Sequence, residues 1–245
     1  MPRISHIHIY PVKALAPIRV REAAVSRSGA LELDRRWAFV DTHGRFVNGK
    51  NRAALHTLQA RFDVCRLEVC LDGRTYSLER QSAEISRWMS DRLGDPVELR
   101  ENRSTGFPDD TASPGPTFVS TGSLRQIGQW FGLPLEDVRL RFRANVEFDG
   151  VEAFWEDQLY DRSFLAGTVL IQGINPCQRC VVPSRDPRTG TSTVDFQRRF
   201  ADLREQNLPP GVNRARFSHY YRLAVNTRIP PTESGKQIRE DDEVT

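Results

Sequence analysis

The stretch Pro176-Cys177-Gln178-Arg179-Cys180, followed by Asp186-Pro187-Arg188-Thr189-Gly190, combines two thiols, a cation and a sharp turn. A thiolate is a nucleophile and a soft, strongly donating metal ligand. The arginine between the cysteines raises the local positive potential, which favours a thiolate and can hold an anion. We predict that a strand over residues 165–171 leads into this motif and that the Pro/Gly turn behind it is a loop. The motif therefore predicts thiolate chemistry beside an anionic group at the end of a β-strand.

The cysteine pair also has three alternative interpretations, which stay open. A structural zinc site takes four ligands, but the remaining cysteines, Cys65 and Cys70, lie five residues apart on a predicted strand and so face opposite sides. A thioredoxin-like pair would begin a helix, whereas this pair ends a strand. The third interpretation is a pair of buried cysteines without chemistry.

The composition indicates a globular protein with a buried core. The chain has 245 residues, of which 38% are hydrophobic and 27% charged, and a net charge of +3. It has no apolar stretch of signal-peptide or transmembrane type, and four cysteines do not make a disulfide scaffold. We therefore expect a cytoplasmic protein that binds neither nucleic acid nor membranes. Lysine is rare beside arginine, and Lys13 and Lys50 both lie in apparent motifs.

Alternating hydrophobicity predicts a β-rich chain with a few helices. The strands are predicted over residues 4–9, 14–25, 34–41, 61–71, 74–78, 118–119, 141–146, 165–171 and 222–229, and the helices over 82–93, 124–131 and 196–206. Residues 101–116 are rich in Pro, Gly, Ser, Thr and Asp, which predicts a loop and a domain boundary. The spacing favours an α+β fold with barrel-like connections over repeated βαβ units.

Several polar residues on these elements are candidates for binding. His6 and His8 share one face of the first strand, and a solvent-facing pair is favoured because no third metal ligand lies nearby. Ser120-Thr121 precedes a helix, where hydroxyls either cap the helix or leave backbone N–H groups to bind an anion. Polar and apolar residues alternate over Arg141-Phe142-Arg143-Ala144-Asn145-Val146. On the predicted strand this places Arg141, Arg143 and Asn145 on one face.

Five motifs occur in a fixed order along the chain. They are Tyr-Pro-Val-Lys at 10–13, Asp-Arg-x-Trp at 34–37, Phe-Val-Ser at 118–120, Arg-Phe-Arg-x-Asn at 141–145, and Pro-Cys-x-Arg-Cys with Asp-Pro-x-Thr-Gly at 176–190. In this order the chain resembles, over nearly its whole length, the MOSC-domain proteins and especially the amidoxime-reducing molybdenum enzymes. The resemblance implies an N-terminal MOSC β-barrel-like domain over 1–105 packed on a C-terminal MOSC β-barrel domain over 106–245.

The resemblance also implies a cofactor and its ligands. Family members bind molybdenum through the dithiolene of a pterin phosphate, and one protein cysteine is a further metal ligand. That cysteine maps to Cys180, whereas Cys177 falls where relatives often have no ligand. The residues that would hold the pterin and its phosphate map to Lys13, Arg35, Ser120, Thr121, Arg143, Asn145 and Arg179. They would form one anion pocket if the two domains met there. Pyridoxal phosphate binding is implied for the family only.

The activity implied by the resemblance is the reduction of N-hydroxylated small molecules by a molybdenum-dependent oxidoreductase. Bacterial relatives often carry an iron–sulfur domain, but this sequence has no cysteine after Cys180, so we expect electrons from a separate donor protein. Two alternatives stay open. The first is a non-catalytic carrier of the molybdenum cofactor or of a persulfide on Cys177 or Cys180, and the second is a dithiol redox protein. Asp186 is expected to shape its turn rather than donate a proton.

Overall fold

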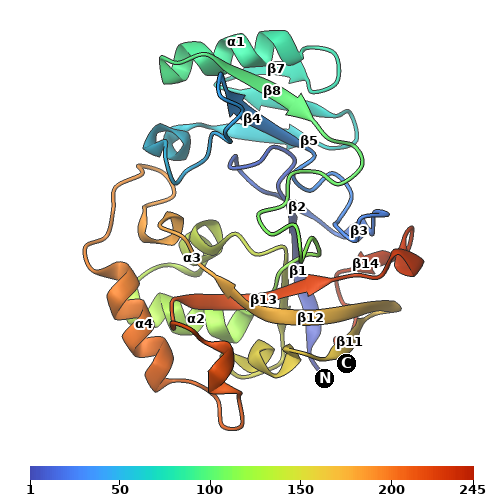
Figure 1. Cartoon of the computed structure of the whole chain (residues 1–245), viewed down its shortest axis with the longest axis vertical. Helices are drawn as coiled ribbons and strands as arrows, with labels where there is room; N and C mark the ends of the chain where they lie inside the picture. Colours follow the sequence, from blue (N-terminus) through green and yellow to red (C-terminus); the bar gives the residue numbers. More distant parts are fainter.

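A computed structural model describes residues 1–245 as two packed parts of unequal size (Figure 1). The chain forms fourteen strands and four α-helices, which confirms the predicted strand-rich α+β class. The larger part is built on a seven-stranded sheet, and the smaller part on a two-stranded and a three-stranded sheet beside one helix. The structure contains no helix with the length and apolar character needed to cross a membrane.

The seven-stranded sheet joins both ends of the sequence. Its strands, in spatial order, are β11 (Ser163–Ala166), β12 (Val169–Gln178), β13 (Arg222–Arg228), β9 (Phe118–Ser120), β10 (Val146–Asp149), β1 (Arg3–Ile9) and β2 (Ile18–Val20). β1 pairs antiparallel with β10, and β3 (Glu22–Ala24) pairs with β14 (Gln237–Arg239). The start of the chain therefore packs with its C-terminal strands, and the two termini lie side by side in Figure 1. The division at residue 105 stays a prediction.

The smaller part has its own core around α1 (Ser82–Leu93), whose predicted bounds are confirmed. Ile85 and Met89 of α1 are buried against the strand pair β4 (Trp37–Asp41) and β8 (Val97–Glu101). The predicted single strand over 61–71 is wrong. It is a hairpin of β5 (Ala60–Asp63) and β6 (Glu68–Leu71), and β6 then pairs with β7 (Arg74–Ser77) across the predicted Asp72-Gly73 turn. Cys65 therefore lies in an exposed turn and shares no strand with Cys70.

Two predicted strands in the larger part are corrected by the structure. The alternating segment 141–146 ends the helix α3 (Leu135–Phe142), and Arg143 closes that helix in the left-handed region with φ 52°. Val138 and Phe142, four residues apart, are both buried, so helical packing outweighs the alternation. The segment 165–171 is a hairpin of β11 and β12, because Gly167 turns the chain with φ 58°.

The helices α2 (Thr121–Phe131) and α4 (Phe196–Gln206) cover the larger sheet beside α3 (Figure 1). The range predicted for α4 is confirmed, and α2 begins three residues before its predicted start. Buried polar groups join these helices to the 3-10 helix over Trp155–Leu159. Glu156 Oε2 accepts a hydrogen bond from the Ser123 hydroxyl at 3.0 Å, and Asp157 forms a buried ion pair with Arg204 of α4.

Glu156 makes the stability of the larger part depend on pH. Its side chain is 0% exposed and its Oε1 has no partner, so burial, together with the nearby Asp157 charge, raises its pKa from 4.5 to about 7. Between these values the unfolded chain releases a proton that the folded protein keeps. We therefore expect the free energy of unfolding to fall by about 3 kcal/mol as pH rises from 4.5 to 7, and to be unaffected by this group at higher pH.

Urea unfolding at pH 4.5 and pH 7.5 checks this prediction. Glu156→Gln keeps an acceptor for Ser123 but cannot titrate, so the variant should lose this component of the pH dependence. An equal pH dependence in the wild type and the variant would show that Glu156 does not hold its proton in the folded state.

Candidate functional site

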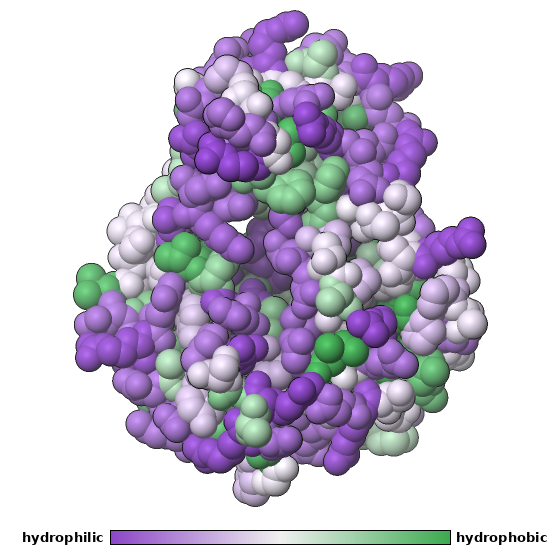
Figure 2. Space-filling model, in the orientation of Figure 1, coloured by the Kyte–Doolittle hydropathy of each residue, from purple (hydrophilic) through white to green (hydrophobic).

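A cavity of about 710 Å³ opens where the two parts meet. Figure 2 shows this region as a hollow among hydrophilic side chains. Its walls come from the turn after β1, the loop before β9, the end of α3 and the end of β12. Six cationic side chains line it against three carboxylates: Lys13, Lys50, Arg35, Arg141, Arg143 and Arg179 against Asp34, Asp109 and Asp110. This excess of positive charge suits an anionic ligand.

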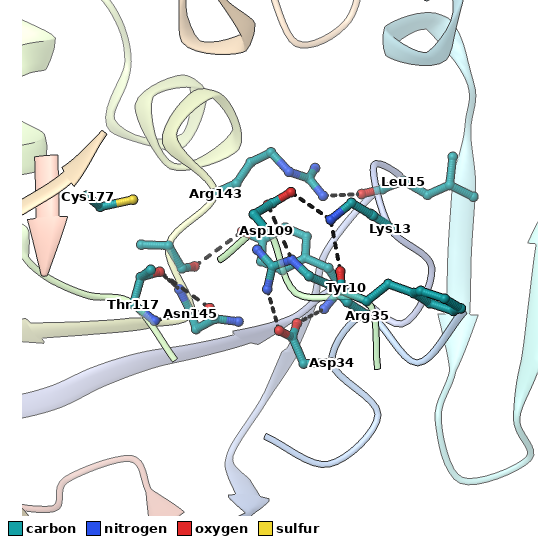
Figure 3. Close-up of polar contacts among 12 residues, drawn as sticks. Tyr10, Lys13, Leu15, Asp34, Arg35, Asp109, Thr117, Arg143, Asn145 and Cys177 are labelled. Atoms are coloured by element: carbon teal, nitrogen blue, oxygen red, sulfur yellow. Dashed lines mark hydrogen bonds and ion pairs between the residues drawn. The ribbon is translucent and has the colours of Figure 1, made fainter. Parts of the chain in front are cut away.

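Two cavity arginines, Arg35 and Arg143, both pack against the aromatic ring of Tyr10. The guanidinium carbons of Arg35 and Arg143 lie 5.2 Å and 4.1 Å from the ring centroid of Tyr10. The negative face of the ring attracts each cation. Burial raises the pKa of Tyr10 to about 12, so the ring stays neutral. Asp34 pairs with Arg35 and accepts the Tyr10 backbone N–H at 2.8 Å, as Figure 3 shows.

Burial has different effects on the two guanidinium groups. It lowers the pKa of Arg143, whose Nη2 donates to the backbone carbonyl of Leu15 at 2.8 Å. Burial also opposes the charge of Arg35, but the carboxylates of Asp34 and Asp109 outweigh it and raise the pKa of Arg35. Of these two guanidinium groups only Arg143 has no carboxylate partner, so it has more to gain than Arg35 from a bound anion.

Lys13 lies beside these arginines at the turn that follows β1. Its side chain is almost fully buried, and its Nζ donates to Asp109 Oδ1 at 2.7 Å and to the carbonyl of Phe107 at 2.8 Å. Burial lowers the pKa of Lys13, and the charge of Asp109 partly offsets this effect. We refer to Lys13, Arg35 and Arg143 as the basic cluster. Figure 3 shows the cluster with Asp109 among its cationic groups.

The cysteine pair lines the same cavity at the end of β12. Arg179 lies between the two cysteines in the sequence. Its Nη1 donates to Cys177 Sγ at 3.0 Å. Its Nη2 donates to the carbonyl of Phe142, and the Val182 N–H donates to Cys180 Sγ at 3.4 Å. Burial opposes the charge of Arg179, but the sulfurs of both cysteines raise its pKa. The cavity therefore joins two thiols to the basic cluster.

The structure places the predicted site residues in two groups. Six of them line the cavity: Lys13, Arg35, Arg143, Asn145, Arg179 and Cys180. Asn145 also holds the fold together, because its amide donates to the His8 carbonyl at 3.1 Å and accepts from the Thr117 N–H at 3.2 Å. The structure does not bring Ser120 and Thr121 to the cavity.

The side-chain hydroxyls of Ser120 and Thr121 make hydrogen bonds inside the larger part. Ser120 Oγ accepts the Ser123 N–H at 3.1 Å and so caps α2. Thr121 Oγ1 donates to Glu147 Oε1 at 2.8 Å. His6 and His8 also differ from expectation, because both are half-buried, with stacked rings 6.0 Å apart.

Sequence patterns do not mark several residues that shape the cavity. Tyr10 belongs to a motif, but the two arginines around its ring cannot be foreseen without the fold. Arg141 is buried and donates to the Pro183 carbonyl at 3.0 Å, although the alternation around it predicts a strand. His56 and Asp109 also line the cavity, and no motif or periodicity in the sequence singles them out.

The sequence matches the MOSC N-terminal beta barrel domain over residues 1–81 and the MOSC domain over residues 117–245. The chain belongs to the MOSC family. The MOSC match begins where the loop wall of the cavity ends, and it contains both cysteines of the pair. The basic cluster spans both matches, since Lys13 and Arg35 belong to the MOSC N-terminal domain and Arg143 to the MOSC domain.

Relatives of this MOSC protein include two proteins named molybdenum cofactor sulfurase. The Drosophila grimshawi protein is 26% identical over 91% of this chain and 33% of its own length. The Homo sapiens protein is 24% identical over 85% of this chain and 29% of its own length. The chain thus spans about a third of the curated relatives it matches. A solved structure, the YUAD protein from Bacillus subtilis, is 11% identical over 100% of this chain and 94% of its own, with a TM-score of 0.43.

Proposed function

We propose that this MOSC protein binds the molybdenum cofactor in the cavity and reduces N-hydroxylated compounds with electrons from a separate donor protein. The observation that carries the proposal is the joining of two thiols to a basic cluster in one cavity of about 710 Å³. A molybdenum-cofactor-related role is also supported by the MOSC domain and by the name of the relatives. A phosphate suits the basic cluster, and a thiolate suits molybdenum.

The donor groups in the cavity fit a metal that arrives with ligands of its own. The structure gathers no group of three or more His, Cys, Asp or Glu side chains that could hold a metal ion. Cys180 would supply one thiolate to a metal that already carries a dithiolene.

In this proposal the role of the protein's own residues is to bind and orient the cofactor. Lys13, Arg35 and Arg143 hold the phosphate, and Cys180 supplies the protein sulfur to the metal. Arg179 keeps the cysteine turn in place through its bonds to Cys177 and to the Phe142 carbonyl. When bound, the cofactor supplies the two-electron exchange that breaks the N–O bond. The overall reaction takes up two electrons and two protons and releases the amine or amidine and one water.

One contact favours a second candidate, a sulfur carrier. Arg179 Nη1 lies 3.0 Å from Cys177 Sγ, where a guanidinium would stabilise a persulfide anion. The matched relatives are named as sulfurases of the molybdenum cofactor, which fits such a role.

Metal analysis and intact mass of the purified protein separate the two candidates. The protein is prepared in a host that makes the molybdenum cofactor, and molybdenum per chain is measured before an aromatic amidoxime is offered with a chemical reductant. We expect close to one molybdenum per chain and conversion of the amidoxime to the amidine. One extra sulfur atom on a cysteine, without molybdenum and without conversion, would favour the carrier.

A further inference from the structure

The loop over residues 102–116, between β8 and β9, forms one wall of the cavity. Backbone hydrogen bonds hold this loop on both sides of its middle segment. The Phe107 N–H donates to the Arg35 carbonyl at 2.8 Å, and the Gly115 N–H donates to the Thr227 carbonyl at 3.0 Å. Between these points, residues 108–111 make no backbone–backbone hydrogen bond. This segment therefore depends on its side chains for its position.

Asp109 ties that segment to the basic cluster. Its Oδ1 lies 2.7 Å from Lys13 Nζ, and its Oδ2 lies 3.7 Å from Arg35 Nε. The Asp109 side chain is 65% exposed, whereas those of Lys13 and Arg35 are 8% and 15% exposed. An accessible carboxylate on a weakly held segment thus pairs with two buried cations. Partial desolvation of the carboxylate where it meets the basic cluster opposes its charge, but Arg35 and Lys13 outweigh this and lower the pKa of Asp109, so it is ionised at neutral pH.

The position of Asp109 has a consequence for any anion that binds the basic cluster. A phosphate bound to Lys13 and Arg35 would lie beside the two cations that the Asp109 carboxylate already pairs with, at 2.7 Å from Lys13 Nζ and 3.7 Å from Arg35 Nε. Two anions at these donors would also repel each other. A ligand phosphate and the Asp109 carboxylate are therefore competitors for the same groups.

We propose that Asp109 is a built-in competitor that sets the anion affinity of the basic cluster, and that a bound phosphate displaces it and releases residues 108–111. This inference deepens the proposed function, because the basic cluster is the proposed phosphate site. When a site is available in only a fraction of the molecules, the apparent affinity falls by that fraction. An Asp109 that is paired in about nine molecules of ten would weaken every anion at this cluster about tenfold.

The test uses the full chain prepared in a host that cannot make the molybdenum cofactor, with phenyl phosphate as the probe. Calorimetric titration should show about tenfold tighter binding in Asp109→Asn than in the wild type. The matched control is Asp110→Asn, which removes a neighbouring charge of the same cavity but keeps an acceptor for the Ala112 and Ser113 N–H groups. The control should bind within about twofold of the wild type. In Lys13→Gln with Asp109→Asn the tighter binding should disappear.

Amide hydrogen exchange gives a second readout on the same samples. Phenyl phosphate should speed exchange in the wild type at Ala112 and Ser113, whose N–H groups donate to Asp110 of the released segment, whereas the Asp109→Asn variant should exchange fast there without ligand. Unchanged or weaker phosphate binding in Asp109→Asn would overturn the proposal, as would slower exchange of this segment on binding or no binding by any variant. Molybdenum content is measured on separate, cofactor-loaded protein, so a failed competition test and a failed proposed function give different results.

Discussion

Cys180→Ala should lower the reduction of an aromatic amidoxime by a hundredfold or more, on the order expected when a ligand of a catalytic metal is lost. Cys180 Sγ accepts the Val182 N–H at 3.4 Å and lines the cavity just beyond β12. Alanine removes the sulfur, and the structure offers no group of metal-binding side chains to replace it. Molybdenum per chain and the sulfur coordination number from X-ray absorption should both fall in the variant.

Two of the three remaining cysteines, Cys65 and Cys177, provide matched controls for this prediction. Cys65→Ala changes an exposed turn of the smaller part and should leave activity and metal content unchanged. Cys177→Ala should lose far less activity than Cys180→Ala. If Cys180→Ala kept full activity, the ligand assignment would be wrong. Equal and complete loss in both cavity variants, without a change in metal content, would favour the dithiol protein instead.

Asp157→Asn should destabilise the protein by about 3–5 kcal/mol, as observed when one partner of a buried ion pair is removed. Asp157 and Arg204 are each 1% exposed at the side chain, and their charges meet between the 3-10 helix over Trp155–Leu159 and α4. Asparagine can still accept from the Tyr160 hydroxyl, which donates to Asp157 at 2.6 Å. The loss therefore comes from the Arg204 charge that remains buried without a counter-charge. Urea unfolding at pH 7.5 measures it.

Two further variants test the cause of that loss. Asp195→Asn removes a carboxylate that pairs with Arg198 at 3.0 Å, with side chains 59% and 75% exposed, and should change the free energy of unfolding by less than about 1 kcal/mol. The double variant Asp157→Asn with Arg204→Met buries no lone charge, so it should be more stable than Asp157→Asn alone. A double variant less stable than the single one would contradict this cause.

The proposed site depends on distant segments that the fold brings together. Lys13 follows β1, Arg143 ends α3, and Cys180 lies just after β12. The placing of β1 inside the larger sheet, between β10 and β2, carries the Tyr10–Lys13 turn to the cavity. Asn145 strengthens this junction because it bonds both to β1 and to the segment before β9. Changes at that junction should therefore affect binding as well as stability.

The local structure can be predicted from the sequence wherever a single pattern acts without competition. The stripe with Ile85 and Met89 predicted α1, the Asp72-Gly73 pair predicted its turn, and the order of the motifs predicted the family. These features depend on neighbours within one or two turns of the chain or on short identities, so they can be read without the fold.

The positions and partners of the polar residues depend on tertiary contacts. The segment with Arg141 and Arg143 alternates like a strand, but the burial of Val138 and Phe142 makes it helical. Ser120 had two possible uses, and its bond to the Ser123 N–H selects the helix cap. The pairing of Asp109 with Lys13 joins residues 96 positions apart. Such contacts follow from the packing of whole elements, because the energy that selects them comes from burial and charge pairing across the fold and leaves no local pattern.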